Sequence, residues 1–142
     1  MTYATLDQLT DRYGAAVLVD LTDRGEVATG LVDAAVVARA LADADALIDG
    51  YLRDRYVLPL AEVPELLATI AAQIAIWNLH TGIPNDKIAE DYKNALRALT
   101  DIGKGAIRLS VAGVAAPETG GTGARMTDRE RPFTPENMRG FI

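Results

Sequence analysis

The residue types that most often carry out catalysis are scarce in this chain. His80 is the only histidine, Ser110 is the only serine, and there is no cysteine. With no second histidine and no cysteine, His80 is a poor candidate for a metal site or a catalytic triad. A serine with no base nearby in the sequence lacks the activation that nucleophilic catalysis requires. The glycines between 120 and 123 neither follow a strand nor open a helix, so they do not form a phosphate-binding loop. We therefore expect no catalytic site and predict that the chain is not an enzyme.

One segment resembles a calcium loop but lacks two of its ligands. Asp20, Thr22 and Gly25 fall at positions one, three and six of such a loop. Arg24 stands where an oxygen ligand is needed, and Leu31 stands where the bidentate glutamate belongs. We expect residues 22–30 to be an ordinary connection between helices, with no metal and no cofactor bound.

The charge of the chain is unevenly distributed. The net charge is −6, and residues 1–116 carry all of it, because residues 117–142 contain four basic and four acidic side chains. An acidic body lacks the basic face that neutralises phosphates in ordinary DNA binding, so we expect no useful affinity for duplex DNA. The start of the chain has no basic region followed by an apolar run, so we expect no signal peptide. No apolar run approaches the roughly 20 residues that span a bilayer, so we expect no membrane partner.

Helical periodicity predicts a mainly α protein, with 142 residues and a hydrophobic fraction of 49%, enough for one modest core. Capping residues, prolines and the apolar pattern place the predicted helix starts at Thr5, Ala15, Asp33, Pro64 and Asp86. The helix from Asp33 is the long central one, and we expect it to end near Tyr56. Its predicted apolar stripe is Val36, Val37, Ala40, Leu41, Ala44, Leu47, Ile48, Tyr51 and Leu52. The stripe predicted for the next helix is Leu66, Leu67, Ile70, Ala71, Ile74 and Trp77.

Two smaller expectations concern the central helix, and a third concerns the residues after the last helix. Gly50 interrupts the central helix, and a close neighbour at that position would explain why it has no side chain. The acidic side chains of this helix are most simply a solvated face, or alternatively the lining of an electronegative channel. Residues 106–111 alternate weakly between apolar and polar and suggest a short strand.

The most distinctive stretch is IDGYLRDRYVLPL, residues 48–60. We expect Tyr51 and Tyr56 to pack inward while each hydroxyl stays near water. Arg55 is placed to hold an adjacent carboxylate or the carbonyls at a helix end, where a cation is favoured. Pro59 then turns the chain into the following helix. The stretch is therefore predicted to be a structural corner, and one side of it is also a candidate contact with another subunit.

The sequence changes character at residue 112. We divide the chain into a helical domain, residues 1–111, and an extended, largely irregular C-terminal arm, residues 112–142. The arm is rich in glycine and proline and has too few apolar residues to fold alone. Its end is nevertheless apolar, which predicts a contact with a partner surface. The candidate contact residues are Phe133, Met138, Arg139, Phe141 and Ile142.

Several of these stretches together resemble the small head–tail connector proteins of Mu-like phages and prophages. The resemblance rests on DRYG, the TDR loop, AL.DADALIDGYL..RY.LPL and the terminal NMRGF, and it covers nearly the whole chain. The layout is also similar to the helical head-to-tail adaptors of long-tailed phages and gene transfer agents. The resemblance implies a structural virion protein in the particle neck, assembled in the bacterial cytoplasm. It also implies a ring of about a dozen subunits that contacts the portal and a neck, stopper or tail protein, with DNA passing through without specific binding.

Two other classes remain open from the sequence. A tail completion or neck protein on the tail side would have the same composition. A small helical regulatory protein is the alternative outside virions, although we find no recognition helix and the charge opposes DNA binding.

Overall fold

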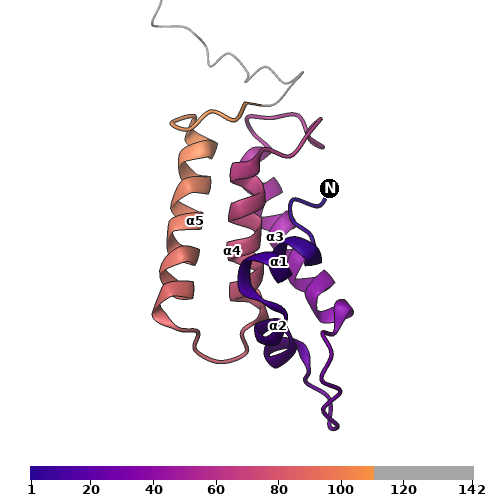
Figure 1. Cartoon of the computed structure of the whole chain (residues 1–142). Helices are drawn as coiled ribbons and strands as arrows, with labels where there is room; N and C mark the ends of the chain where they lie inside the picture. The colour runs from indigo at the N-terminus through magenta and orange to yellow at the C-terminus, as the bar shows by residue number, and fades with distance from the viewer. Residues whose placement is uncertain (111–142) are drawn as a thin grey trace, which may run out of the picture.

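Five α-helices make up the regular structure of residues 1–110, the part of the chain that the computed structural model describes (Figure 1). They are α1 (Leu6–Tyr13), α2 (Ala15–Thr22), α3 (Ala34–Leu52), α4 (Glu65–Leu79) and α5 (Asp86–Lys104). The prediction of a mainly helical bundle with a long central helix is confirmed. The predicted arm, residues 112–142, lies outside the described residues.

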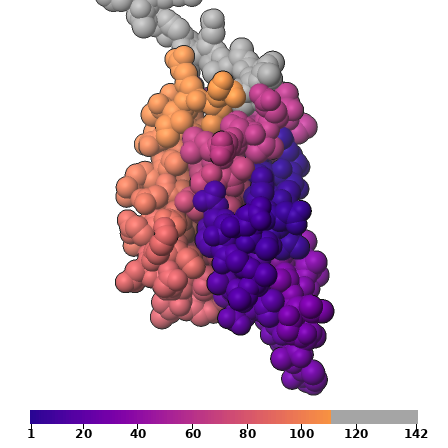
Figure 2. Space-filling model, viewed as in Figure 1, coloured from indigo at the N-terminus to yellow at the C-terminus, as the bar shows by residue number. Residues whose placement is uncertain are grey.

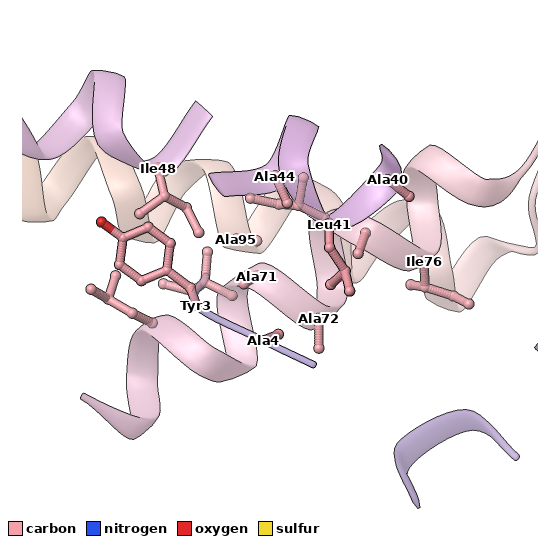
Figure 3. Close-up of a cluster of buried hydrophobic side chains, with 14 of the residues drawn as sticks. Tyr3, Ala4, Ala40, Leu41, Ala44, Ile48, Ala71, Ala72, Ile76 and Ala95 are labelled. Carbon is pink, nitrogen blue, oxygen red and sulfur yellow. The ribbon is translucent and has the colours of Figure 1, made fainter. Parts of the chain in front are cut away.

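The core lies between α3, α4 and α5, with α1 packed against α3 and α4. The buried residues at the centre include many alanines, whose small side chains allow helix backbones to approach closely. Figure 3 shows Ala40 and Ala44 of α3, Ala71 and Ala72 of α4, and Ala95 of α5 in this cluster. Larger side chains such as Ile48 and Ile76 fill the space between them.

Helix α4 is enclosed on several sides rather than along one stripe. Ala72, Ala75 and Ile76 are buried in addition to four of the predicted positions. Two other predicted core positions are wrong. Leu66 is 41% exposed, because it lies in the first turn of α4 at the end of the bundle. Trp77 is only half-buried, and it stacks on Tyr92 of α5 with ring centroids 4.4 Å apart.

The helix starts follow the local chemistry of their first residues. Thr5 and Gln8 form the predicted capping box of α1. Asp33 caps α3 as predicted, accepting from the backbone N–H of Ala35 at 3.0 Å. The start of α5 is capped by Asn85, whose side-chain oxygen accepts from Ile88 N–H at 2.9 Å.

The end of α3 differs slightly from the prediction. The helix itself ends at Leu52, and a turn continues to Tyr56, in which the N–H groups of Arg55 and Tyr56 both donate to the Leu52 carbonyl. The expected close neighbour at Gly50 is absent from the described residues, since a Cβ there would have no atom within 4 Å. The short strand predicted from residue 106 is also wrong over residues 106–110. Its N–H groups bond elsewhere, those of Ala106 and Ile107 to the Asp101 carbonyl.

The N-terminal segment packs against α3 and is part of the core, as Tyr3 and Ala4 show in Figure 3. Tyr3 is 2% exposed, its N–H donates to Asp45 Oδ1 at 2.9 Å, and its hydroxyl donates to Asp49. Burial, followed by the bond to Asp49, raises the pKa of Tyr3, and burial also raises the pKa of Asp45. The expectation of a wholly solvated acidic face on α3 is therefore wrong for these two carboxylates, because they bind the first residues of the chain.

Candidate functional site

The predicted corner, which we define as residues 51–60, contacts the end of α5. Arg55 donates from Nε to the Gly103 carbonyl at 3.3 Å and from Nη2 to the Lys104 carbonyl at 2.9 Å. These carbonyls belong to the last turn of α5, where they have no partner within the helix and carry the negative end of the helix dipole. Of the two partners expected for Arg55, helix-end carbonyls are therefore correct, although they belong to a different helix.

A glycine at the end of α5 makes room for this arginine. Gly105 has φ +83°, a left-handed conformation that favours glycine. A Cβ at this position would lie 2.5 Å from Cζ of Arg55. Gly103 is also close to the corner, since a Cβ there would lie 3.2 Å from the Tyr51 carbonyl oxygen. The corner and the end of α5 therefore approach each other at glycine positions.

Tyr56 holds the residues that follow α5. Its side chain is 4% exposed, and its hydroxyl accepts a hydrogen bond from the Leu109 N–H at 3.0 Å. The expectation that this hydroxyl stays near water is wrong, because residues 106–110 fold back over the corner and enclose it. Leu109 is itself only 8% exposed, so its N–H would have little access to water without this partner.

The remaining predicted site residues have different positions. Tyr51 is half-buried against the core, whereas Pro59 is exposed and follows a cis peptide bond from Leu58. The five candidate contact residues of the arm lie outside the described part of the chain. They are Phe133, Met138, Arg139, Phe141 and Ile142.

The corner thus holds the last part of the described chain in place, directly before residues 111–142. Arg55 and Tyr56, one residue apart, bind two successive parts of residues 103–109. Figure 1 shows the corner and residues 105–110 together at one end of the bundle. Sequence reasoning found Arg55 and Tyr56 but missed Leu109, because a backbone N–H donor leaves no signal in the sequence.

Two of the residues considered for chemistry, His80 and Thr22, make local hydrogen bonds. His80 ends α4, with Nδ1 2.7 Å from the Ile76 carbonyl oxygen. Thr22 is buried, donates to the Leu18 carbonyl and accepts from the Asp33 N–H. Within residues 1–110, no group of three or more histidine, aspartate or glutamate side chains is arranged to hold a metal ion. In the same part of the chain, no helix is long and apolar enough to cross a membrane.

A groove of about 330 Å³ lies between α1 and α4. Asp11, Arg12 and Glu65 contribute charged groups to it, and Ala68 and Ala72 contribute apolar surface. Arg12 donates to the Thr69 hydroxyl at 3.3 Å. No nucleophile with an adjacent base occurs among the residues that line this groove, so its geometry does not indicate a catalytic centre.

Comparison with known proteins identifies the family. Residues 3–128 match the family model described as bacteriophage Mu, Gp36. The chain belongs to this Gp36 family. It is 35% identical over 142 residues to "Gene product J" of Escherichia phage Mu, covering 100% of both chains. It is also 33% identical over 140 residues to "Mu-like prophage FluMu protein gp36" of Haemophilus influenzae, covering 99% of this chain and 98% of that protein.

Membership of the Gp36 family confirms the Mu-like phage and prophage part of the resemblance. The matched range includes the whole of the corner and the residues that it holds. The similarity covers all 142 residues for the phage Mu protein and 140 residues for the Haemophilus influenzae protein, so in both cases it extends into the predicted arm.

Proposed function

We propose that this chain is a structural protein of a phage or phage-like particle, a head–tail connector that forms a ring between portal and tail. The observation that carries the proposal is the end-to-end similarity to a protein of phage Mu, over body and arm alike. The connector role itself comes from the resemblance of the quoted motifs to head–tail adaptors.

The corner supports a role in assembly. Arg55 and Tyr56 hold residues 103–109 at one end of the bundle, and 32 further residues follow Ser110. A fixed starting point limits the surfaces that a following segment can reach. Phe133 and Phe141, near the end of that segment, each contribute about 1.5–3 kcal/mol if fully buried against a neighbouring subunit.

The charge of the body supports passage of DNA without binding. Residues 1–116 carry ten basic and sixteen acidic side chains. DNA-binding proteins gain most of their nonspecific affinity from neutralising phosphates, and this body has a net negative charge instead. A ring of such subunits would repel DNA weakly and would leave it free to move.

Genetic complementation tests the proposal. Particles produced without this chain should accumulate as DNA-filled heads and separate tails, and supplying the full chain should restore joined particles. A chain ending at Ala116 should keep its helical circular dichroism spectrum and yet fail to restore joining. Normal yields of joined particles without the chain would overturn the connector role. Defective tails with heads correctly completed would point to the tail-side alternative.

A further inference from the structure

One end of the bundle exposes three large apolar side chains. Val27 is 78% exposed and Leu31 is 69% exposed, and both belong to the connection between α2 and α3, residues 23–33, which we call the finger. Ile83, in the connection between α4 and α5, is 99% exposed. Figure 2 shows the finger projecting from the body. Exposed apolar groups gathered at one end of a small protein mark a contact surface.

The finger has a fixed shape. The carboxylate of Asp23 accepts from the N–H groups of Thr29 and Gly30, both at 2.9 Å, and from the Thr29 hydroxyl at 3.1 Å. These bonds favour the ionised carboxylate and lower the pKa of Asp23. The apolar side chains of the finger are therefore presented by a backbone that its own polar groups hold in place, which reduces the entropy lost on binding.

The base of the finger is joined to the end of α4. Arg24 donates to the Leu21 carbonyl at 2.9 Å and to the Leu79 carbonyl at 2.6 Å. Leu79 is the last residue of α4, directly before the connection that contains Ile83. The finger and this connection, residues 80–85, therefore lie at the same end of the bundle (Figure 1), and we call them together the finger end.

The two ends of the bundle carry opposite charge. Around the finger end, residues 20–33 and 80–87 contain five acidic and two basic side chains, a net charge of −3. Around the corner, residues 53–64 and 104–110 contain four basic and two acidic side chains, a net charge of +2. The corner also exposes an apolar side chain, since Val57 is 76% exposed. We call residues 53–64 and 104–110 the corner end.

We propose that the finger end of one copy docks on the corner end of a second copy. The opposite charges and the exposed apolar side chains at both ends select a second copy as the occupant. The proposal rests on the proposed function, because a ring requires each subunit to bind its neighbours through two different surfaces. A contact between unlike surfaces continues from copy to copy and closes into a ring if the rotation permits, whereas a contact between like surfaces stops at a dimer.

Two sets of substitutions separate the two surfaces. Val27→Asp with Leu31→Asp alters the finger end, and Arg53→Glu with Arg108→Glu alters the corner end. The finger set should weaken self-association by about a hundredfold, since each buried apolar side chain accounts for roughly tenfold in affinity. The corner set should weaken it as well, because two glutamates would face the acidic finger end and repel it. Lys93→Glu with Arg97→Glu, on exposed residues in the middle of α5 and away from both ends, is the matched control and should assemble normally.

Mixing the variants tests whether the contact joins unlike ends. An equimolar mixture of the two variants retains one intact finger end and one intact corner end, on different chains. Native mass spectrometry should therefore show a heterodimer of two 15.2 kDa chains and nothing larger. Asp20→Lys with Glu26→Lys repeats the finger test by charge alone, without new polar groups at the apolar positions.

The outcomes decide the proposal. It is overturned if the finger variants assemble as the wild type does, if the mixture stays monomeric, if the corner variant alone forms dimers, or if the wild-type chain is monomeric at every concentration. Complementation with the finger variant separates this proposal from the proposed function. If that variant joins heads to tails at normal yield, the docking surface is wrong while the connector role, tested by deletion of the chain, stands.

Discussion

Replacing Tyr56 by phenylalanine isolates the bond that holds the residues after α5. The substitution removes only the hydroxyl, which accepts from the Leu109 N–H at 3.0 Å in a buried environment. The ring is retained, so the packing of the 4% exposed side chain should change little. The N–H of Leu109 then loses its partner while it remains enclosed, which costs about 1–3 kcal/mol.

That cost should be local. Residues 106–110 can separate from the corner without unfolding α3, α4 or α5, so the loss of the bond should mainly increase the local opening of this segment. If the lost bond costs about 1.4 kcal/mol, near the lower end of that range, the opening equilibrium of this segment shifts tenfold. The amide of Leu109 should then exchange with solvent about tenfold faster. The amides in the middle of α4 should keep the wild-type exchange rate.

Amide hydrogen exchange measured residue by residue provides the assay. Tyr51→Phe is the matched control, because the Tyr51 hydroxyl makes no hydrogen bond within the described residues. If Leu109 exchanges at the same rate in the wild type and in Tyr56→Phe, the corner does not hold this segment and the reasoning is wrong. Equal acceleration in α4 would also contradict it, since the effect would then be global.

Three further changes test neighbouring parts of the structure. Arg55→Met keeps the apolar stem but loses both bonds to the end of α5. Because the guanidinium is partly exposed, we expect the free energy of unfolding measured in urea to fall by about 1 kcal/mol. An unchanged urea midpoint would contradict this. Gly105→Ala should cost about 1–2 kcal/mol from its left-handed backbone, and more because the new Cβ would lie 2.5 Å from Cζ of Arg55. Arg55→Met removes that clash but not the backbone cost, so full additivity of the two changes would argue against a direct contact. Because the pKa of Asp23 lies below its ordinary value of 3.8, its ionised form stabilises the fold above pH 3.8 and loses this effect as pH falls through the lowered pKa. The difference in stability between wild type and Asp23→Asn should therefore be fully present at neutral pH and should shrink below pH 3.8, and a difference that grows on acidification would refute the assignment.

The helices could be predicted because their signals are local. Thr5, Asp33 and Pro64 mark helix starts through capping or a fixed backbone angle, and these depend only on nearby residues. The packing of α4 could be predicted only in part. Periodicity alone does not say how many neighbouring helices surround a helix. It therefore predicts a buried Trp77, whereas this side chain lies half-buried against Tyr92.

The corner shows where sequence reasoning ends. A cation near a helix terminus suggests that Arg55 binds carbonyls, but which helix supplies them depends on the three-dimensional path of the chain. The same holds for Asp45 and Asp49, which appear solvated on a helical projection and bind Tyr3 in the structure. The weak alternation after residue 105 suggested a strand, whereas side-chain and turn bonds use those N–H groups instead.

The position of this chain in a particle tests the central claim most directly. Cryo-electron microscopy of purified particles should show the bundle of residues 1–110 repeated as a ring between portal and tail. The density for each copy should continue from Ser110, next to the corner, toward an adjacent subunit or neck component. Particles in which this chain is absent from the head–tail junction, or in which it is found only at another site, would contradict the account.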